Sequence, residues 1–310
     1  MSKVLVTGAS GLLGRAVYAE LSQQPQFEVV GSAYRRTRPP LQSIDLTSAE
    51  AIDEAFSTIA PDIIVHCAAE RRPDVSEQDP QAALALNVEA TRALALAAKR
   101  HNTWLIYIST DYVFDGTASN YTELDKPNPV NFYGESKWRG EQVVQAVSDD
   151  FVILRLPILY GQVERIDESA VLVLLQHLNA EQTQSIDNWA VRSPTSTADI
   201  AQTLVKLIQR KKVTGDVHGI YHFSASERMS KYDMLLKLAK LVGKSAEHLE
   251  AADLPTDTAK RPQDCSLLCQ RLDELGIKSE LSFLEGAYQA LADSPQALNL
   301  VGMQLHQQEK

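Results

Sequence analysis

Short apolar segments alternate with longer amphipathic segments through the first half of the chain. Nearly continuous hydrophobicity is typical of strands that are buried on both faces, as in a parallel sheet. The segments that we predict to be strands are KVLVT (3–7), FEVVGSA (27–33), DIIVHCA (62–68), WLIYIS (104–109) and FVILRL (151–156).

Helical patterns fill the intervals between these strands. In the longest interval Leu86, Ala90, Leu94 and Ala97 recur at the spacing of an amphipathic helix. The predicted helices span residues 12–23, 47–59, 80–101 and 133–148. Strands that alternate with helices predict an α/β fold, with a Rossmann-type doubly wound parallel sheet and right-handed crossovers.

The alternation weakens after about residue 157. Helices are predicted near 169–179, 196–210, 230–242 and 282–292, and one further strand at GIYHFSA (219–225). We therefore predict a Rossmann core over residues 1–157 and a smaller C-terminal α/β lobe, mainly for substrate, over residues 158–300. That lobe covers the carboxyl edge of the sheet or partly returns to the core, and residues 301–310 form a loose tail.

Composition and charge narrow the class of protein. The chain has 310 residues, of which 44% are hydrophobic and 23% charged, a mixture typical of a folded globular protein. A formal net charge of −10 argues against a general binder of nucleic acid or anionic membrane, because polyanions would be repelled. A local basic patch could still bind a phosphorylated small molecule.

The N-terminus and the cysteines give no sign of secretion or of a metal site. MSKVLVTGAS lacks the apolar stretch of a signal peptide, and no apolar run is long enough to span a membrane. Cys67, Cys265 and Cys269 do not make a disulfide framework, and the last two lack the companion ligands that zinc requires. We expect a reduced, soluble, cytoplasmic protein without a metal.

A glycine-rich motif follows the first strand directly. VLVTGASGLLGRAV places Gly8, Gly11 and Gly14 at the end of the strand and the start of the helix. This arrangement suits a tight turn that brings the backbone close to a pyrophosphate, with the helix N-terminus facing the anion. The alternative is a glycine-rich turn without a ligand. The expected backbone contacts come from Gly8, Ser10, Gly11, Leu12, Leu13 and Gly14.

The TGxxGxxG spacing resembles the extended short-chain dehydrogenase/reductase family. In that family the end of the second strand distinguishes the nicotinamide cofactors. Here it reads GSAYRRTRP, with no acidic residue for a ribose hydroxyl but with Arg35, Arg36 and Arg38. Guanidinium groups suit a 2′-phosphate, so the loop favours NADP(H); the alternative is a solvated basic loop. By the same resemblance Asp45 and Leu46 flank the adenine, and Cys67, Ala68 and Ala69 pass the middle of the cofactor.

A tyrosine and a lysine lie four residues apart in NFYGESK (131–137). Tyr133 and Lys137 would share one face of a helix, and a nearby ammonium would lower the pKa of the phenol. In YISTDYVFDG (107–116) Thr110 follows an apolar strand, at the sheet edge where ligands bind in this architecture. Together they predict a catalytic site; the alternative is two motifs that only cap the core.

STDYVFDG and YGESK resemble the dTDP-4-dehydrorhamnose reductase group of this family. Further similar segments are RSPTSTADIA (192–201) and AKRPQDCSLL (259–268). The resemblance implies an NADPH-dependent reductase of a 4-keto sugar nucleotide. It gives Thr110 the role of hydroxyl partner of the carbonyl, Tyr133 that of general acid, and Lys137 that of binding the cofactor ribose.

A second resemblance is to the regulatory beta subunits of methionine adenosyltransferase. It rests on YRRTRP, HCAAERRPDV (66–75) and LRLPILYG (154–161). It implies the reductase fold and NADP binding, but a regulatory role on the catalytic subunit of that synthetase. The residues that would then line the cofactor are Tyr34, Arg35, Arg36, Cys67, Arg71 and Leu159.

The run Glu70-Arg71-Arg72 departs from the usual reductase sequence near the nicotinamide. These side chains bind a substrate phosphate, gate the site, or pair with one another on the surface. The sequence does not choose between these readings, nor between turnover and regulation. It also leaves open whether the chain forms a homodimer.

Overall fold

A parallel sheet forms the centre of the molecule. The computed structural model describes residues 1–34, 36–255 and 260–305. Within these residues the largest sheet has seven strands in the order β10-β6-β5-β4-β1-β2-β3, and every neighbouring pair is parallel. The strands are β1 (Ser2–Thr7), β2 (Phe27–Ala33), β3 (Gln42–Ser43), β4 (Ile63–His66), β5 (Trp104–Thr110), β6 (Val152–Leu156) and β10 (Gly219–His222).

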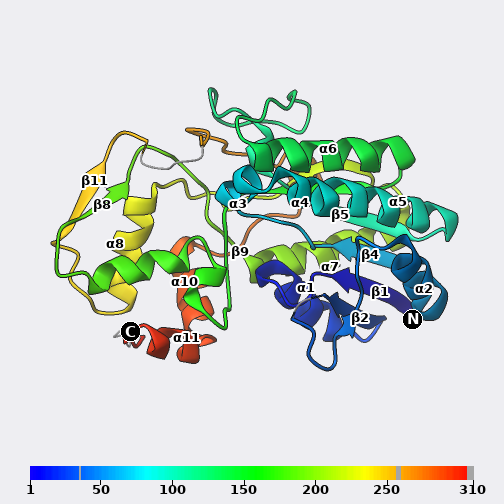
Figure 1. The fold of residues 1–310 in the computed structure, drawn as a ribbon, viewed down its shortest axis with the longest axis horizontal. Coiled ribbons are helices and arrows are strands. Elements are labelled where there is room, and N and C mark those ends of the chain that lie inside the picture. Colours follow the sequence, from blue (N-terminus) through cyan, green and yellow to red (C-terminus); the bar gives the residue numbers. More distant parts are fainter. Residues whose placement is uncertain (35, 256–259, 306–310) are drawn as a thin grey trace.

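The strand order reverses beside β1. The chain first runs outward through β2 and β3 and then returns to the other side of β1 with β4. In open α/β sheets ligands bind outside the carboxyl ends of the strands at such a reversal. The predicted Rossmann-type doubly wound fold is therefore confirmed (Figure 1).

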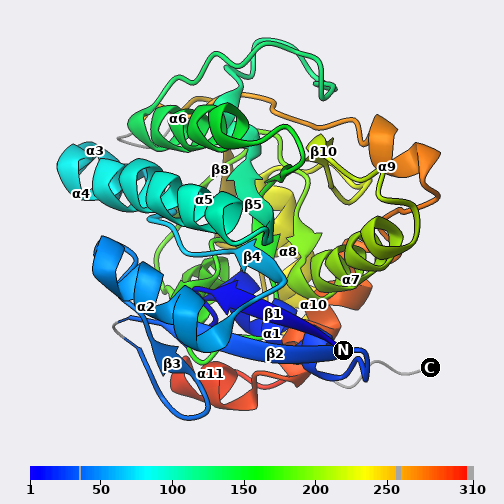
Figure 2. The same cartoon turned by 90° about the vertical axis from the view of Figure 1, so that its right-hand side faces the viewer.

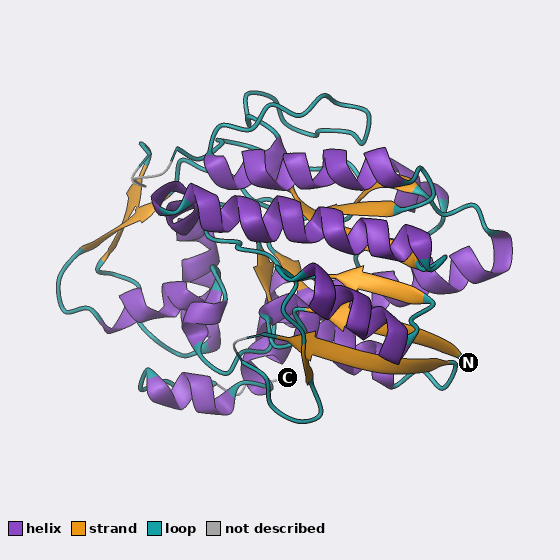
Figure 3. Ribbon diagram, turned by 45° about the vertical axis from the view of Figure 1, so that its right-hand side comes forward, coloured by secondary structure: helices purple, strands orange, loops and turns teal. Residues whose placement is uncertain are grey.

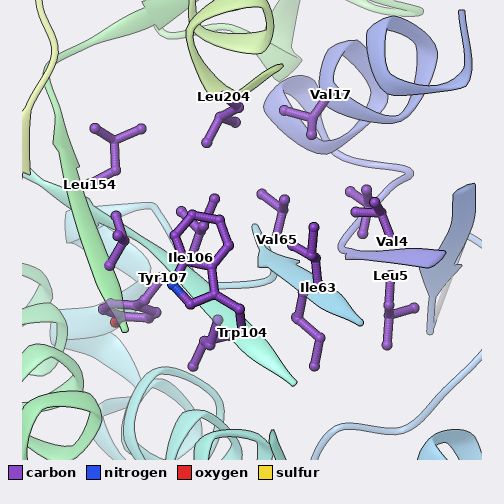
Figure 4. Packing of buried hydrophobic residues seen from close by; sticks show 14 of the residues in the cluster. Val4, Leu5, Val17, Ile63, Val65, Trp104, Ile106, Tyr107, Leu154 and Leu204 are labelled. Carbon is purple, nitrogen blue, oxygen red and sulfur yellow. The ribbon is translucent and has the colours of Figure 1, made fainter. Parts of the chain in front are cut away.

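Helices cover both faces of the sheet. Figure 2 shows α2 (Ala49–Ile59), α5 (Ala90–Arg100) and α6 (Phe132–Val147) on one face, with α1 (Leu12–Ser22) and α7 (Thr197–Thr214) on the other. In Figure 4 Val17 of α1 and Leu204 of α7 lie on the same side of the buried strands, and both are 0% exposed. The strands are apolar throughout because helices bury both of their faces.

The second half of the chain partly returns to this sheet. Helix α7 and strand β10 share one hydrophobic cluster with β1, β2, β4, β5 and β6, because Ile200, Leu204 and Tyr221 pack into it. A second cluster, which includes Tyr160, Leu235 and Phe283, lies under a small sheet of β8 and β11. The domain boundaries read from the sequence stay a prediction.

Figure 3 shows the remaining helices and strands together with those of the central sheet, coloured by secondary structure. They are α3 (Pro73–Gln78), α4 (Pro80–Leu84), η1 (Ala85–Glu89), η2 (Asp111–Val113), β7 (Leu159–Tyr160), η3 (Ile166–Glu168), η4 (Leu172–Asn179), β8 (Gln184–Asp187), β9 (Thr195–Ser196), α8 (Lys231–Leu241), β11 (Leu249–Ala252), α9 (Gln270–Glu274), α10 (Phe283–Ala292) and α11 (Pro295–Leu300). Among the described residues no helix is both long and apolar enough to cross a membrane.

Three segments of the structure differ from the sequence prediction. The helix expected over 80–101 changes to a π-helix at η1, where the buried side chain of Asn87 hydrogen-bonds outside its own helix. The helix expected over 169–179 is a 3₁₀ helix over Leu172–Asn179, and the Ser169 hydroxyl accepts the N–H groups of Val171 and Leu172 at its start. Met303 is buried in the second cluster, so residues 301–305 are not loose; residues 306–310 lie outside the described part.

A buried ion pair joins α6 to the sheet. Arg155 of β6 donates Nε to Glu141 Oε1 (2.9 Å) and Nη2 to Oε2 (2.7 Å), and both side chains are 1% exposed. Ser109 of β5 donates its hydroxyl to Glu141 Oε1 (2.5 Å), and Arg155 Nη1 lies 3.3 Å from His222 Nε2. Because these partners belong to β5, β6, β10 and α6, the pair fixes the helix that carries Tyr133.

Replacing Arg155 with Met should destabilise the fold by about 3–5 kcal/mol, because Glu141 would keep a buried charge without its partner. Urea unfolding measures this loss. The matched control is Arg139→Met on the same helix, whose pair with Glu135 (2.7 Å) has side chains that are 47% and 29% exposed. The control should cost less than about 1 kcal/mol. Equal losses in the two variants would contradict the structural role of the buried pair.

Candidate functional site

The glycine turn brings three backbone segments close together. Gly8 has φ +67°, and a Cβ added there would lie 2.8 Å from Ala68 N at the end of β4. A Cβ added to Gly14 would lie 2.2 Å from Gly8 O. Larger side chains would therefore push the first turn of α1 away from β1 and β4. The close packing that a pyrophosphate cradle requires is present.

The N-terminus of α1 is free to bind an anion. Gly11 is its N-cap and supplies no capping side chain, and no acidic residue lies in the first turn. The first N–H groups of a helix have no intrahelical acceptor, so they can bind phosphate oxygens. Ser10 and Gly11 are half-buried, whereas Leu12 and Leu13 are buried and pack into the second and the first hydrophobic cluster respectively. These residues fit the phosphates of a dinucleotide.

The loop after β2 carries the residues predicted to select the cofactor. Arg36 is exposed and its Nη1 donates to Glu168 Oε1, while Tyr34 is 60% exposed. Arg35 lies outside the described residues. Asp45 accepts from Thr47 N (2.9 Å), and Leu46 is buried.

An arginine-rich pocket of about 520 Å³ lies at this edge of the sheet. It is lined by Arg36, Ala69, Glu70, Arg71, Arg72, Arg165, Asp167 and Glu168. Arg71 donates Nη2 to the backbone oxygen of Glu168 (2.7 Å), and its charge also acts on Tyr133. The pocket therefore contains Arg36, which is predicted to bind the 2′-phosphate, and Arg71, whose charge acts on the predicted catalytic tyrosine.

Glu70 and Arg72 pair with each other, which was one of the three readings of this run. Arg72 donates Nε and Nη2 to the two carboxylate oxygens of Glu70, at 3.0 and 2.9 Å. Arg71 points instead to Glu168. The backbone of Glu70 is held by Asn87 on the π-helix, which also donates to Ser136 Oγ (3.0 Å).

Thr110 and Tyr133 meet at the carboxyl edge. Thr110 ends β5, accepts from Tyr112 N (3.2 Å) and donates to Asp111 Oδ1 (3.1 Å). Tyr133 lies in the first turn of α6, whose N-cap Asn131 accepts from Gly134 N (2.9 Å). The ring of Tyr133 packs edge to face against Tyr112, with ring centroids 5.9 Å apart, and burial raises the pKa of the phenol, an effect that the nearby Thr110 hydroxyl opposes only in part.

Lys137 does not act on Tyr133 as expected. Its ammonium donates to Ile108 O (2.7 Å) and lies 4.0 Å from the centre of the Tyr107 ring. Burial lowers the pKa of Lys137 to about 7, against the opposing effects of Glu141 and Cys67. Burial also raises the pKa of Tyr133, so the predicted lowering by the lysine is wrong. Burial of both groups outweighs the single charge one helical turn away.

The other predicted cofactor residues line the same edge. Cys67, Ala68 and Ala69 follow β4 directly and are half-buried. Burial raises the pKa of the Cys67 thiol to about 12, so the group stays neutral. Leu159 of β7 packs against both hydrophobic clusters, where the two parts of the molecule meet.

Four further residues belong to this site. The sequence does carry a signal for Asn87, because it is a polar amide among the apolar positions of a predicted helix. Asp111 is buried next to Thr110, and burial raises its pKa to about 7. Arg15 and Glu168 gave no local signal, because their contact joins residues 153 positions apart.

Comparison with known proteins supports both resemblances. The family model described as RmlD substrate binding domain matches residues 2–295. Methionine adenosyltransferase 2 subunit beta of Mus musculus is 41% identical over 291 residues, which cover 93% of this chain and 87% of the mouse protein. A probable low-salt glycan biosynthesis reductase, Agl14 of Haloferax volcanii, is 32% identical over 300 residues, which cover 91% and 97% of the two chains.

Solved structures agree with these relatives. The dTDP-4-dehydrorhamnose reductase of Bacillus anthracis, solved in complex with NADP, superposes with a TM-score of 0.81. It is 27% identical, and the match covers 94% of this chain and 98% of that one. The predicted membership of the extended short-chain dehydrogenase/reductases is confirmed, and the chain belongs to the RmlD substrate binding domain family.

Proposed function

We propose that this chain binds NADP(H) at the glycine turn and reduces the 4-keto group of a sugar nucleotide. The observation that carries the proposal is that the side chains of Thr110 and Tyr133 lie close together at the same sheet edge as the Gly8–Gly14 turn. The similarity to a dTDP-4-dehydrorhamnose reductase solved with NADP supports the same chemistry.

Different residues are proposed to bind different parts of the cofactor. Ser10, Gly11, Leu12 and Leu13 offer backbone N–H groups to the pyrophosphate, and Arg36 offers a guanidinium to the 2′-phosphate. By resemblance Tyr34, Arg35, Asp45 and Leu46 surround the adenosine end, while Cys67, Ala68, Ala69, Arg71 and Leu159 follow the chain of the cofactor, and Lys137 binds the nicotinamide ribose. NADPH held there supplies the hydride. Residues 158–300 mainly bind the sugar nucleotide.

Tyr133 acts as the general acid in this proposal. Because its pKa is raised, the phenol carries its proton at neutral pH and can donate it to the carbonyl oxygen. Thr110 orients the same oxygen through its hydroxyl. The positive charge of Arg71 favours the phenolate that remains, which reduces the free-energy cost of the transfer.

Replacing Tyr133 with Phe should reduce turnover of dTDP-4-dehydrorhamnose by about 10²–10⁴-fold, because the proton donor is lost. NADPH oxidation measures turnover, and a binding titration should show NADPH affinity within a few fold of the wild type. The matched control is Tyr288→Phe on α10, a tyrosine that is 37% exposed. A Tyr133→Phe variant with wild-type turnover would rule out this role.

Replacing Arg36 with Gln should weaken NADP binding about tenfold to a hundredfold and leave NAD binding unchanged, because only NADP carries the 2′-phosphate. Calorimetric titration gives both affinities. Arg139→Gln removes the same charge from a side chain of α6 that is 47% exposed and serves as the control. Similar losses in the two variants would show a general charge effect rather than a specific contact.

A second function is supported by the sequence similarity. The chain covers 87% of the mouse beta subunit at 41% identity, higher than its identity to the reductase structure. The alternative proposal is an NADP-binding regulatory subunit of a methionine adenosyltransferase. In this role the chain contacts the catalytic subunit of the synthetase and changes its kinetics.

Mixing this chain with the methionine adenosyltransferase of its own organism tests the alternative. The regulatory role predicts co-elution in gel filtration and a changed KM or kcat for S-adenosylmethionine synthesis. The Tyr133→Phe variant should have the same effect on the synthetase as the wild type, because regulation does not use the proton donor. Separate elution with unchanged kinetics would eliminate the regulatory role.

A further inference from the structure

One glutamate binds three arginines from three different connections of the sheet, two through its carboxylate and one through its backbone oxygen. Glu168, on η3, accepts from Arg15 of α1 (2.7 Å to Oε2) and from Arg36 after β2, which donates to Oε1. Its backbone oxygen accepts from Arg71 after β4 (2.7 Å). Two of these arginines are in the predicted cofactor site, yet Glu168 comes from the second half of the chain.

The carboxylate itself is firmly held. The Glu168 side chain is 10% exposed, and Oε2 also accepts from Glu164 N (3.1 Å). Burial raises the pKa of Glu168, but the hydrogen bonds and charges of Arg15 and Arg36 outweigh it, so the pKa is lowered and the group is ionised. The Arg36 side chain is 52% exposed, so it is the partner that a bound phosphate can reach.

The charges of the cluster leave a net positive site. Arg15, Arg36 and Arg71 carry three positive charges, while Glu168 and Glu164, which approaches Arg15 at 3.4 Å, carry two negative charges, which leaves a net charge of +1. Three guanidinium groups in one place would repel one another without the carboxylate between them. A phosphate monoester carries about −1.5 to −2 at neutral pH, so this positive site attracts it.

We propose that Glu168 is a positioning residue that holds Arg36 toward the 2′-phosphate of NADP(H) and thereby sets the preference for the phosphorylated cofactor. The proposal rests on NADP(H) binding at the glycine turn. Arg36 has five N–H donors, and Glu168 uses one, so others remain for a phosphate. Held in place before binding, the guanidinium loses less side-chain freedom when the phosphate arrives.

Calorimetric titration of Glu168→Gln with NADP⁺ and NAD⁺ tests this role. The amide keeps the size of the side chain but removes its charge, so NADP⁺ affinity should fall about five- to thirtyfold. NAD⁺ affinity should change less than about twofold, because NAD⁺ has no 2′-phosphate. The control is Glu164→Gln, whose side chain is 57% exposed and approaches Arg15 at 3.4 Å; it should bind both nucleotides like the wild type.

A double variant distinguishes positioning from a general structural effect. In an Arg36→Gln background, Glu168→Gln should weaken NADP⁺ binding by less than about twofold further, because its effect passes through Arg36. Equal losses for NADP⁺ and NAD⁺, or an unchanged or tighter NADP⁺ affinity, would overturn the positioning role while NADP binding itself stands. A wild-type chain that binds no NADP⁺ would overturn both proposals.

Discussion

Close backbone packing around Gly8 and Gly14 determines what the carboxyl edge of the sheet can hold. Gly14 allows the first turn of α1 to approach Gly8 O, and Gly8 allows the end of β4 to approach the turn. The first N–H groups of α1 then face the same space as the loops after β2 and β4. Every residue assigned to the cofactor depends on this convergence.

The catalytic half of the site is held by buried polar contacts rather than by apolar packing alone. Glu141 and Arg155 fix α6 against β5 and β6, and Asn87 ties the same helix to the Glu70 loop. A buried polar or charged group that loses its partner costs free energy, so any shift of α6 that breaks these contacts is unfavourable. Tyr133 therefore reaches Thr110 from a rigid element.

The sheet and the site differ in how far the sequence predicts them. Continuous apolar runs predicted the core strands because burial on both faces leaves little choice of residue. The short strands β7 and β9, of two residues each, and the π-helix at Asn87 depend on contacts from distant segments, and no local pattern marks them. Glu168 was not predicted as a site residue, because its contacts with Arg15, Arg36 and Arg71 also come from distant segments. The pKa of Tyr133 was predicted in the wrong direction, because its burial depends on how α6 lies against β5.

A crystal structure of this chain with NADPH tests most directly whether the two halves of the site form one active centre. We expect density for the pyrophosphate at the N-terminus of α1, for the 2′-phosphate against Arg36, and for the nicotinamide beside the Tyr133 hydroxyl. A dinucleotide bound elsewhere, or a nicotinamide out of reach of Tyr133, would contradict the reductase mechanism.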